Sequence, residues 1–298
     1  MSQALLRVTE TPARTGQDRL SDADFSRIAT LIGGHVGIKL PPAKRLMVEG
    51  RLRKRMRSLN CASLTDYCRY LFHENGLENE LVHVIDAVTT NKTDFFRENE
   101  HFVLLRQKLI PSLTARRPAG AKPRLKLWSA ASSNGAEAYT IAMVLADMVE
   151  RGDDFQFAIL GTDISTEMLA AGRQATYPSE MIAPVPLDMQ ERYLMRGRTT
   201  SWHGEVRIVP ELRRLVRFQR LNLMEETYPV DRDVDVIFLR NVLIYFDKPT
   251  QEAVVSRLVG HLRPGGFLIL GHSESMIGTN LQLKQWAPGV FENTSGLR

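Results

Sequence analysis

The sequence predicts a doubly wound α/β domain that follows a small all-helical domain. Apolar residues keep helical spacing over residues 21–88. From about residue 125 onward, strand-like runs alternate with helical ones, which favours a parallel sheet covered by helices. Residues 177–214 interrupt this alternation with prolines and one alternating stretch, which predicts a small inserted antiparallel β-subdomain. We therefore expect a flexible tail at 1–20, a helical domain at 21–92 and an α/β domain at 93–298.

One helix of the first domain is strongly basic. Residues 44–57 hold seven basic side chains against one acid, Glu49. An apolar stripe runs along this helix through Val48, Leu52, Met56 and Leu59, and the basic side chains cover its other faces. Such clustering indicates an acidic partner, which could be nucleic acid, a membrane surface or a glutamate-rich protein. A merely solvated basic face remains the alternative.

The helices and strands of the α/β domain are predicted from runs of residues with different hydrophobic patterns. A helix over 98–113 links it to the first domain. Strands are predicted at 125–129, 155–161, 216–221, 234–239 and 267–270, and helices at 137–150, 166–174 and 249–262. Residues 263–266, with one proline and two glycines, predict a turn, and residues 204–209 alternate like an exposed strand.

Ligands of doubly wound sheets bind at the carboxyl ends of the strands, so the residues there are the candidates. The small-residue loop that contains Gly135 follows the first strand and opens a helix. Asp163 ends the second strand, where an acid commonly accepts hydrogen bonds from ribose hydroxyls. Each has an ordinary alternative: the loop is a tight turn, and Asp163 is a helix cap.

The later strand ends and the domain junction add polar candidates. Asn222 and Leu223 follow the third strand and could hold an adenine edge and face. Arg240 and Asn241 follow the fourth, and an arginine at the mouth of an apolar strand needs partners. A buried structural ion pair is the alternative there. Between the domains, residues 89–98 carry Asn91, Thr93 and Arg97 beside two phenylalanines, which domain packing alone explains less well.

Composition limits the other possibilities. No apolar run approaches the roughly 20 residues of a membrane span, and the N-terminus has no signal-peptide core, so we expect a cytoplasmic protein without membrane insertion. Cys61 and Cys68 are expected two turns apart on one helix, too far to bridge, as buried thiols. The seven histidines form no HxxxH or His/Cys cluster, so we expect no metal.

These motifs together resemble the CheR family of chemotaxis-receptor methyltransferases. The resemblance rests on TTNKTDFFRE, the loop ending in GAEAYT, GTDIS, QRLNL, FLRNVLIYF and LRPGGFLILGHSES, in order over about residues 25–291. It implies a Rossmann-like class I S-adenosylmethionine-dependent methyltransferase domain and methyl ester formation on glutamate side chains of chemotaxis receptors. S-adenosylhomocysteine would be the product.

The resemblance also implies roles for individual residues. Asn91, Thr93, Arg97, Glu137, Asp163, Asn222, Leu223, Arg240 and Asn241 would contact the cofactor, with Asp163 at the ribose and Asn222 and Leu223 at the adenine. Arg97, Arg240 and Tyr245 would lie near the reacting groups. Arg51, Arg53, Lys54, Arg55 and Arg57 would dock on the methylated helices of the receptor. The partner would be the cytoplasmic helical region of a methyl-accepting receptor, bound by a monomer, with no nucleic acid involved.

Two segments depart from the family pattern. Residues 133–140 read SNGAEAYT where members usually read STGEEPYS, which bears on cofactor affinity. Residues 197–204 lack the short GxG turn of members that dock on a receptor's C-terminal peptide, so such tethering is not expected. The alternatives are an RNA methyltransferase, although no RNA-binding motif is visible, and a non-catalytic cofactor-binding adaptor.

Overall fold

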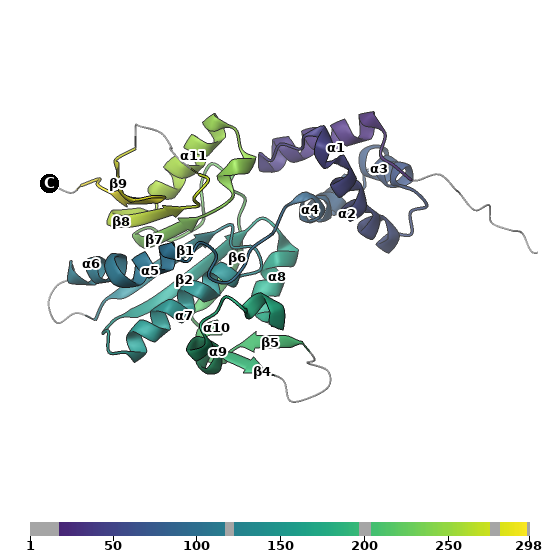
Figure 1. Ribbon diagram of the computed structural model, residues 1–298. Helices are drawn as coiled ribbons and strands as arrows, with labels where there is room; N and C mark the ends of the chain where they lie inside the picture. The colour runs from purple at the N-terminus through teal and green to yellow at the C-terminus, as the bar shows by residue number, and fades with distance from the viewer. Residues whose placement is uncertain (1–17, 117–121, 197–203, 275–280, 297–298) are drawn as a thin grey trace, which may run out of the picture.

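The computed structural model describes residues 18–116, 122–196, 204–274 and 281–296. A helical domain, purple to blue in Figure 1, lies beside a larger sheet domain that is wound by helices. Among the described residues no helix is long and apolar enough to cross a membrane.

The helical domain packs around one apolar core. Its helices are α1 (Asp22–Val36), the short 3-10 helix η1 (Pro42–Lys44), α2 (Arg45–Ser58), α3 (Leu64–His73) and α4 (Leu77–Val88). Ser21 caps α1, since its hydroxyl accepts a hydrogen bond of 3.0 Å from the backbone N–H of Asp24. Leu20, at the end of the expected tail, is buried in this core. The packed core of the helical domain therefore includes Leu20, one residue before the Ser21 cap of α1.

The two cysteines do not share a helix. Cys68 is buried in α3, whereas Cys61 lies ahead of α3 and is only half-buried, and both are free thiols. The expectation of two buried thiols on one helix was therefore wrong for Cys61. Ser63 is the reason, because its hydroxyl caps α3 and sets the start of that helix at Leu64.

The linking helix predicted over 98–113 is interrupted. It consists of α5 (Glu100–Leu104), a π-helical turn η2 (Leu105–Leu109) and α6 (Ile110–Ala115). Pro111 follows the π-helical turn inside a continuous helical run, where its missing N–H removes one backbone hydrogen bond.

The main sheet has the strand order β6-β2-β1-β7-β8-β10-β9. Its strands are β1 (Arg124–Ala130), β2 (Gln156–Asp163), β6 (Val216–Arg220), β7 (Val234–Leu239), β8 (Leu262–Leu270), β9 (Leu283–Ala287) and β10 (Val290–Asn293). The pairs among β6, β2, β1, β7 and β8 are parallel, and β10 is antiparallel to both neighbours. The chain order reverses between β1 and β7, which makes this place the topological switch point. The doubly wound class I fold predicted from the sequence is confirmed.

Side chains of β7 alternate between two cores, which explains its nearly continuous apolar run. Phe238 faces the core shared with α6 and α7 (Ala136–Glu150), while Ile237 and Leu239 face the core shared with α11 (Lys248–Val259). Helix α8 (Thr166–Gln174) follows β2 and packs on β6. Both faces of the central strands are thus covered, as parallel sheets require.

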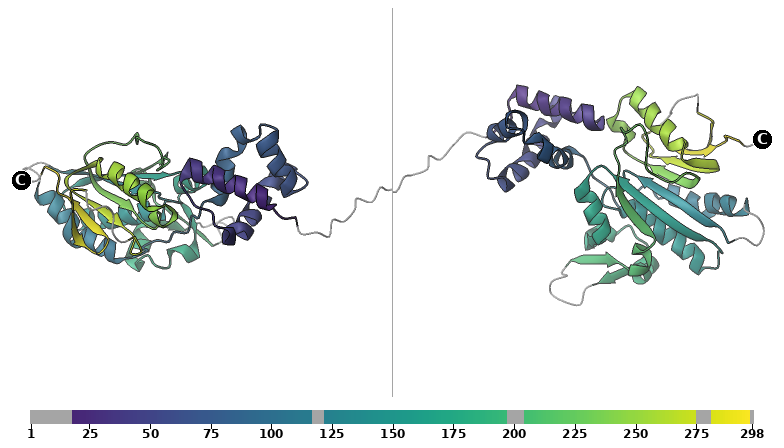
Figure 2. Two further views of the ribbon diagram at one scale, coloured as in Figure 1. Left: turned by 90° about the horizontal axis from the view of Figure 1, so that it is seen from above. Right: turned by 180° about the vertical axis from the view of Figure 1, so that it is seen from behind.

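The inserted subdomain is a three-stranded antiparallel sheet in the order β3-β5-β4. It comprises β3 (Thr176–Pro178), the 3-10 helix η3 (Ser179–Ile182), α9 (Leu187–Tyr193), β4 (Leu194–Arg196), β5 (Glu205–Ile208) and α10 (Pro210–Arg213). Seen from behind in Figure 2, this small sheet lies to one side of the main sheet. Asp147 of α7, fully buried, binds Arg192 of α9 at 2.7 Å and Arg106 of the linking helix at 2.6 Å. This pairing ties the insertion to the sheet domain.

Two features near the C-terminus differ from expectation. Residues 263–266 were predicted as a turn, but they lie within β8 as an irregularity, because Val234 pairs with Leu262 and Val236 already pairs with Phe267. The hairpin of β9 and β10 was not predicted at all. Its strands are short and β9 is largely exposed, so it carries little hydrophobic pattern.

Candidate functional site

A cleft opens at the carboxyl edge of β1, β2 and β7, beneath the segment that joins the two domains. It is lined by Ile38, Lys44, Val88, Thr89, Thr90, Asn91, Lys92, Thr93, Asp94, Arg97, Ala131, Ser132, Ser133, Glu137, Asp163, Ile164, Arg240, Asn241, Val242 and Tyr245. Because it lies at the switch point of the sheet, its place is the one that nucleotide ligands take in such folds.

A second hollow continues the cleft toward α1. It shares Asp163 and Tyr245 with the first and adds Asn222, Leu223 and Val36. Asn222 donates a hydrogen bond of 2.7 Å to the carbonyl of His35 and accepts one from the N–H of Met224. The end of α1 thus forms one wall of the proposed adenine end, which the sequence did not reveal.

The loop after β1 holds Asp163 at the floor of the cleft. The backbone N–H groups of Ser133 and Ser165 donate to the two carboxylate oxygens of Asp163, at 2.8 and 2.9 Å. Burial raises the pKa of Asp163, and these N–H groups offset part of the rise. Gly135 has a φ of 87°, and a Cβ there would lie 2.8 Å from the ring of Phe218. Only glycine allows the loop this close approach.

Arg240 is held between two carboxylates at the opposite wall. Its guanidinium donates to Glu137 at 3.0 Å and to Glu98 at 3.1 Å, and also to the carbonyl of Arg97. Its side chain is only 2% exposed. Asn241 donates to the other oxygen of Glu98 at 3.0 Å. The ion pair considered from the sequence exists, and it lies within the cleft wall.

Glu98 is ionised in this setting. Burial raises the pKa of Glu98, but the hydrogen bond from Asn241 and the charge of Arg240 outweigh it, so the net pKa lies below its ordinary value. Nearby, burial and then the charge of Arg240 lower the pKa of His101 to about 4. The His101 ring is therefore neutral at pH 7.

Glu274 organises the turn that follows β7. Its two carboxylate oxygens accept hydrogen bonds of 2.6 to 2.8 Å from four backbone N–H groups, those of Gly271, Asn241, Val242 and Leu243. Asn241 has a φ of 61°, in the left-handed region. Burial raises the pKa of Glu274, and these four N–H groups, which suit an ionised carboxylate, offset part of the rise. Glu274 thus fixes the path of the chain from Arg240 to Tyr245.

Arg97 and Tyr245 make few contacts with other residues around the cleft. Arg97 is half-buried and donates to the carbonyl of Lys92 at 3.0 Å. Tyr245 is half-buried, and the amino group of Lys44 lies 5.0 Å from the centre of its ring, a cation–π contact. These side chains are placed to meet a group that enters the cleft from solvent.

The residues predicted from the sequence for cofactor and chemistry converge in this one cleft. Asn91, Thr93, Arg97, Glu137, Asp163, Arg240, Asn241 and Tyr245 line the first hollow, and Asn222 and Leu223 line the second. Glu98 and Glu274 were not assigned a role, although both stand in the quoted motifs FFRE and GHSES. The one available signal for Glu98 was that Arg240, at the end of an apolar strand, needs a partner.

The predicted docking side chains divide into two groups. Arg51 donates to the carbonyls of Ala87 and Thr89, and Arg55 pairs with the buried Glu80 through two hydrogen bonds of 2.6 and 2.8 Å. Arg53 donates to Glu49 and to the carbonyl of Asp18. Lys54 and Arg57 are exposed. Three of the five cations therefore hold the helical domain together.

The cleft fits S-adenosylmethionine by its own chemistry. Asp163 offers a buried carboxylate at the floor, the Gly135 loop allows close approach, and the hydroxyl of Ser132 is buried without a hydrogen-bond partner among the described residues. A ligand with hydroxyl or amino groups would satisfy such a site. Fold and cleft together indicate a protein that binds a nucleoside-type cofactor at the carboxyl edge of its sheet.

Comparison with known families identifies the family to which the chain belongs. Residues 23–89 match the family described as "CheR methyltransferase, all-alpha domain", and residues 91–289 match "CheR methyltransferase, SAM binding domain". The chain belongs to the CheR methyltransferase family, and S-adenosylmethionine is its cofactor.

Similar curated proteins cover most of the chain. A protein named chemotaxis protein methyltransferase 2 from Pseudomonas aeruginosa is 39% identical over 85% of this chain and 87% of its own length. A chemotaxis protein methyltransferase from Escherichia coli is 41% identical over 91% of this chain and 88% of its own. One from Borreliella burgdorferi is 33% identical over 90% and 93%.

Proposed function

We propose that this protein forms methyl esters on glutamate side chains in the cytoplasmic helical region of chemotaxis receptors, acting as a monomer in the cytoplasm. The observation that carries the proposal is the position of Lys44. It lies at the start of the basic helix and also lines the cleft. An acidic helix that binds the exposed cations of α2 would thus have its side chains near the cleft mouth. The names of the similar curated proteins agree with a role in chemotaxis.

The nucleophile of this reaction needs no general base. A glutamate side chain in water has a pKa of about 4.3 and is ionised at neutral pH. S-adenosylmethionine supplies an electrophilic methyl group when it is bound. The task of the protein is therefore to orient a carboxylate and to strip its water.

Arg97 is the better candidate for orienting the incoming carboxylate. Arg240 already pairs with both Glu98 and Glu137 and is almost fully buried. Arg97 contacts only a backbone carbonyl with its guanidinium among the described residues, and it is half-buried at the cleft. We propose that Arg97 meets the substrate, that Arg240 positions the cofactor side of the cleft through its two carboxylates, and that Tyr245 lies beside the reacting groups.

The remaining cleft residues would hold the cofactor. Asp163 would accept from the ribose, and Asn222 and Leu223 would border the adenine. Asn91, Thr93, Glu137 and Asn241 would contact its amino-acid part. Residues 133–140 depart from the family pattern, but Glu137 is still held in place. Its carboxylate accepts a hydrogen bond of 2.6 Å from Ser129 and another from Arg240.

Docking would rest on the exposed cations of α2. Lys54 and Arg57 are exposed and would steer an acidic helix over a range set by the Debye length of about 8–10 Å. Because Arg51, Arg53 and Arg55 make internal contacts, we assign them to the support of this surface.

The test is transfer of labelled methyl from S-adenosylmethionine to membranes that contain chemotaxis receptors. We expect label on receptor protein that alkali releases, as an ester requires, and loss of labelling with Arg97→Ala. Label on RNA would favour the RNA methyltransferase alternative. Cofactor binding in calorimetry without transfer to any receptor would favour a non-catalytic adaptor, and either result would refute the proposal.

A further inference from the structure

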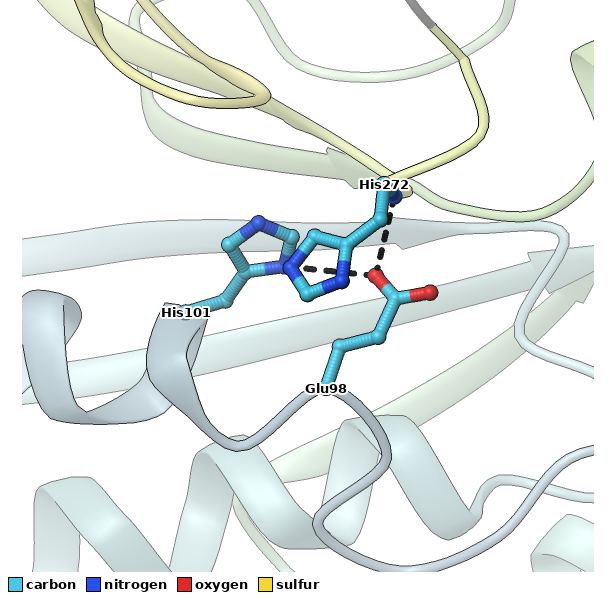
Figure 3. Close-up of side chains that lie close together, drawn as sticks. All are labelled: Glu98, His101 and His272. Carbon is cyan, nitrogen blue, oxygen red and sulfur yellow. Dashed lines mark hydrogen bonds and ion pairs between the residues drawn. The ribbon is translucent and has the colours of Figure 1, made fainter.

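Behind the Arg240 wall, two histidines that are remote in sequence meet Glu98. Figure 3 shows Glu98, His101 and His272 pointing toward one another from the linking segment and from the loop after β8. One donor atom from each side chain lies within 4.8 Å of those of the other two. The sequence had led us to expect no metal, because its seven histidines form no HxxxH or His/Cys cluster.

His101 is the unusual member of this group. It is 2% exposed, and neither ring nitrogen makes a regular hydrogen bond to any described residue. Its Nδ1 lies 3.6 Å from Oε2 of Glu98, too far for a hydrogen bond, and its Nε2 faces the backbone at Pro288. A buried imidazole whose nitrogens lack regular hydrogen bonds is costly unless a ligand completes it.

The geometry suits a small divalent ion. Zinc binds nitrogen and oxygen donors at about 2.0–2.2 Å in tetrahedral sites, so neighbouring donors lie roughly 3.4 Å apart. The His101–Glu98 pair is close to that separation, and His272 is exposed and can turn toward the ion. Its ring lies 4.9 Å from that of His101. The backbone carbonyl of Pro288 beside Nε2 would serve as the outer partner that metal-bound histidines usually have.

The charges near the site are mixed, because Arg240 opposes a cation at His101 whereas Glu98 favours one. Three carboxylates, those of Glu98, Glu137 and Glu274, are gathered around the single guanidinium of Arg240 and the turn that follows it. We propose that Glu98, His101 and His272 form a site for a divalent transition metal ion with imidazole and carboxylate ligands, for which Zn²⁺ is the probe, and that a water molecule completes it from the exposed side.

The site is coupled to the cleft through Glu98. Oε2 of Glu98 accepts from Arg240 and from the backbone N–H of His272, and it is the oxygen that faces His101. A metal ion that takes this oxygen loosens Arg240, which lines the cleft. Metal and S-adenosylmethionine therefore oppose each other, and by linkage each weakens the other equally. This coupling rests on the cofactor placement proposed above, whereas the metal site itself does not.

The experiment is a titration of the full chain, with any polyhistidine tag removed, by Zn²⁺ in competition with a chromophoric chelator. We expect one ion per chain and a dissociation constant at least ~10-fold weaker in His272→Ala, since loss of an outer partner alone commonly costs that much. His83→Ala, which removes an exposed histidine from α4, should match the unchanged protein. No Zn²⁺ binding, or equal binding by His272→Ala with an unchanged melting temperature, overturns the site.

The coupling is measured separately by calorimetry. The dissociation constant of S-adenosylmethionine should rise several-fold in saturating Zn²⁺ for the unchanged protein and stay constant for His272→Ala. If Zn²⁺ binds at this site and the cofactor constant does not move, the metal site stands and the coupling is wrong. Neither readout requires methyl transfer, so failure of the proposed receptor activity leaves both intact.

Discussion

Replacing Glu274 by glutamine tests how the turn from Arg240 to Tyr245 is held in place. The carboxylate holds four backbone N–H groups with two oxygens, at 2.6 to 2.8 Å. Glutamine has the same shape but only one acceptor oxygen, and its amide N–H₂ would face two of the donors. At most two of the four hydrogen bonds survive in any rotamer, and the other two donors are left buried without partners.

The magnitude follows from the two lost bonds. Hydrogen bonds to charged groups contribute about 1.5–3 kcal/mol each, so the loss amounts to roughly 3–6 kcal/mol before relaxation. Since Asn241 and Val242 are half-buried, water recovers part of this. We expect a loss of about 3 kcal/mol, which lowers the melting temperature by roughly 6–12 °C for a chain of this size class.

The assay joins thermal unfolding with cofactor titration at a temperature where both proteins are folded. If Glu274 positions the turn from Arg240 to Tyr245, the folded variant should bind S-adenosylmethionine at least several-fold more weakly. The matched control is Glu252→Gln on α11, where the side chain is exposed and the change should stay within about 0.5 kcal/mol. Unfolding and cofactor affinity equal to those of the unchanged protein would show that Glu274 does not organise this turn.

Three further predictions concern the arginines and lysine assigned above. Arg97→Ala should lower methyl transfer at least ~100-fold with little change in melting temperature or cofactor affinity, since the lost group orients only the substrate; near-normal turnover would remove Arg97 from the reaction. Lys54→Glu combined with Arg57→Glu should raise the apparent KM for receptor several-fold, more at low salt than at high salt. The control Arg214→Glu, an exposed change outside α2, should leave this KM unchanged. Equal KM values for the double variant and the control would exclude docking on α2. Arg55→Ala should cost about 3 kcal/mol of stability, measured by urea unfolding, because it strands a buried carboxylate, and an unchanged midpoint would return Arg55 to the docking surface.

The identity of the cleft residues could be predicted because parallel strands end at one edge. Asp163, Asn222 and Arg240 each follow a separate strand, and the doubly wound order brings those ends together whatever the intervening helices do. Local signals were equally direct for α1, whose capping serine and acidic first turn mark its start. These features depend on periodicity and on residue type at a strand end, which one sequence displays.

The sequence could not predict which charged residues pair with one another. The basic helix shows its cations in sequence, but only packing decided that Arg55 turns to Glu80 on α4 and that Lys54 stays in solvent. The same holds for Arg240, whose two carboxylates come from the linking segment and from α7. The partner of a long charged side chain depends on which residues the fold brings near it, and the sequence does not display these spatial distances.

The sequence by itself determined the order of the elements, the parallel sheet and the set of residues at its carboxyl edge, because hydrophobic periodicity and strand-end chemistry are local. Tertiary structure alone decided that Glu274 binds three N–H groups of the turn after β7, and that His101 and His272 face one carboxylate. Those contacts join segments that are far apart in the chain, and their geometry exists only after the sheet has formed.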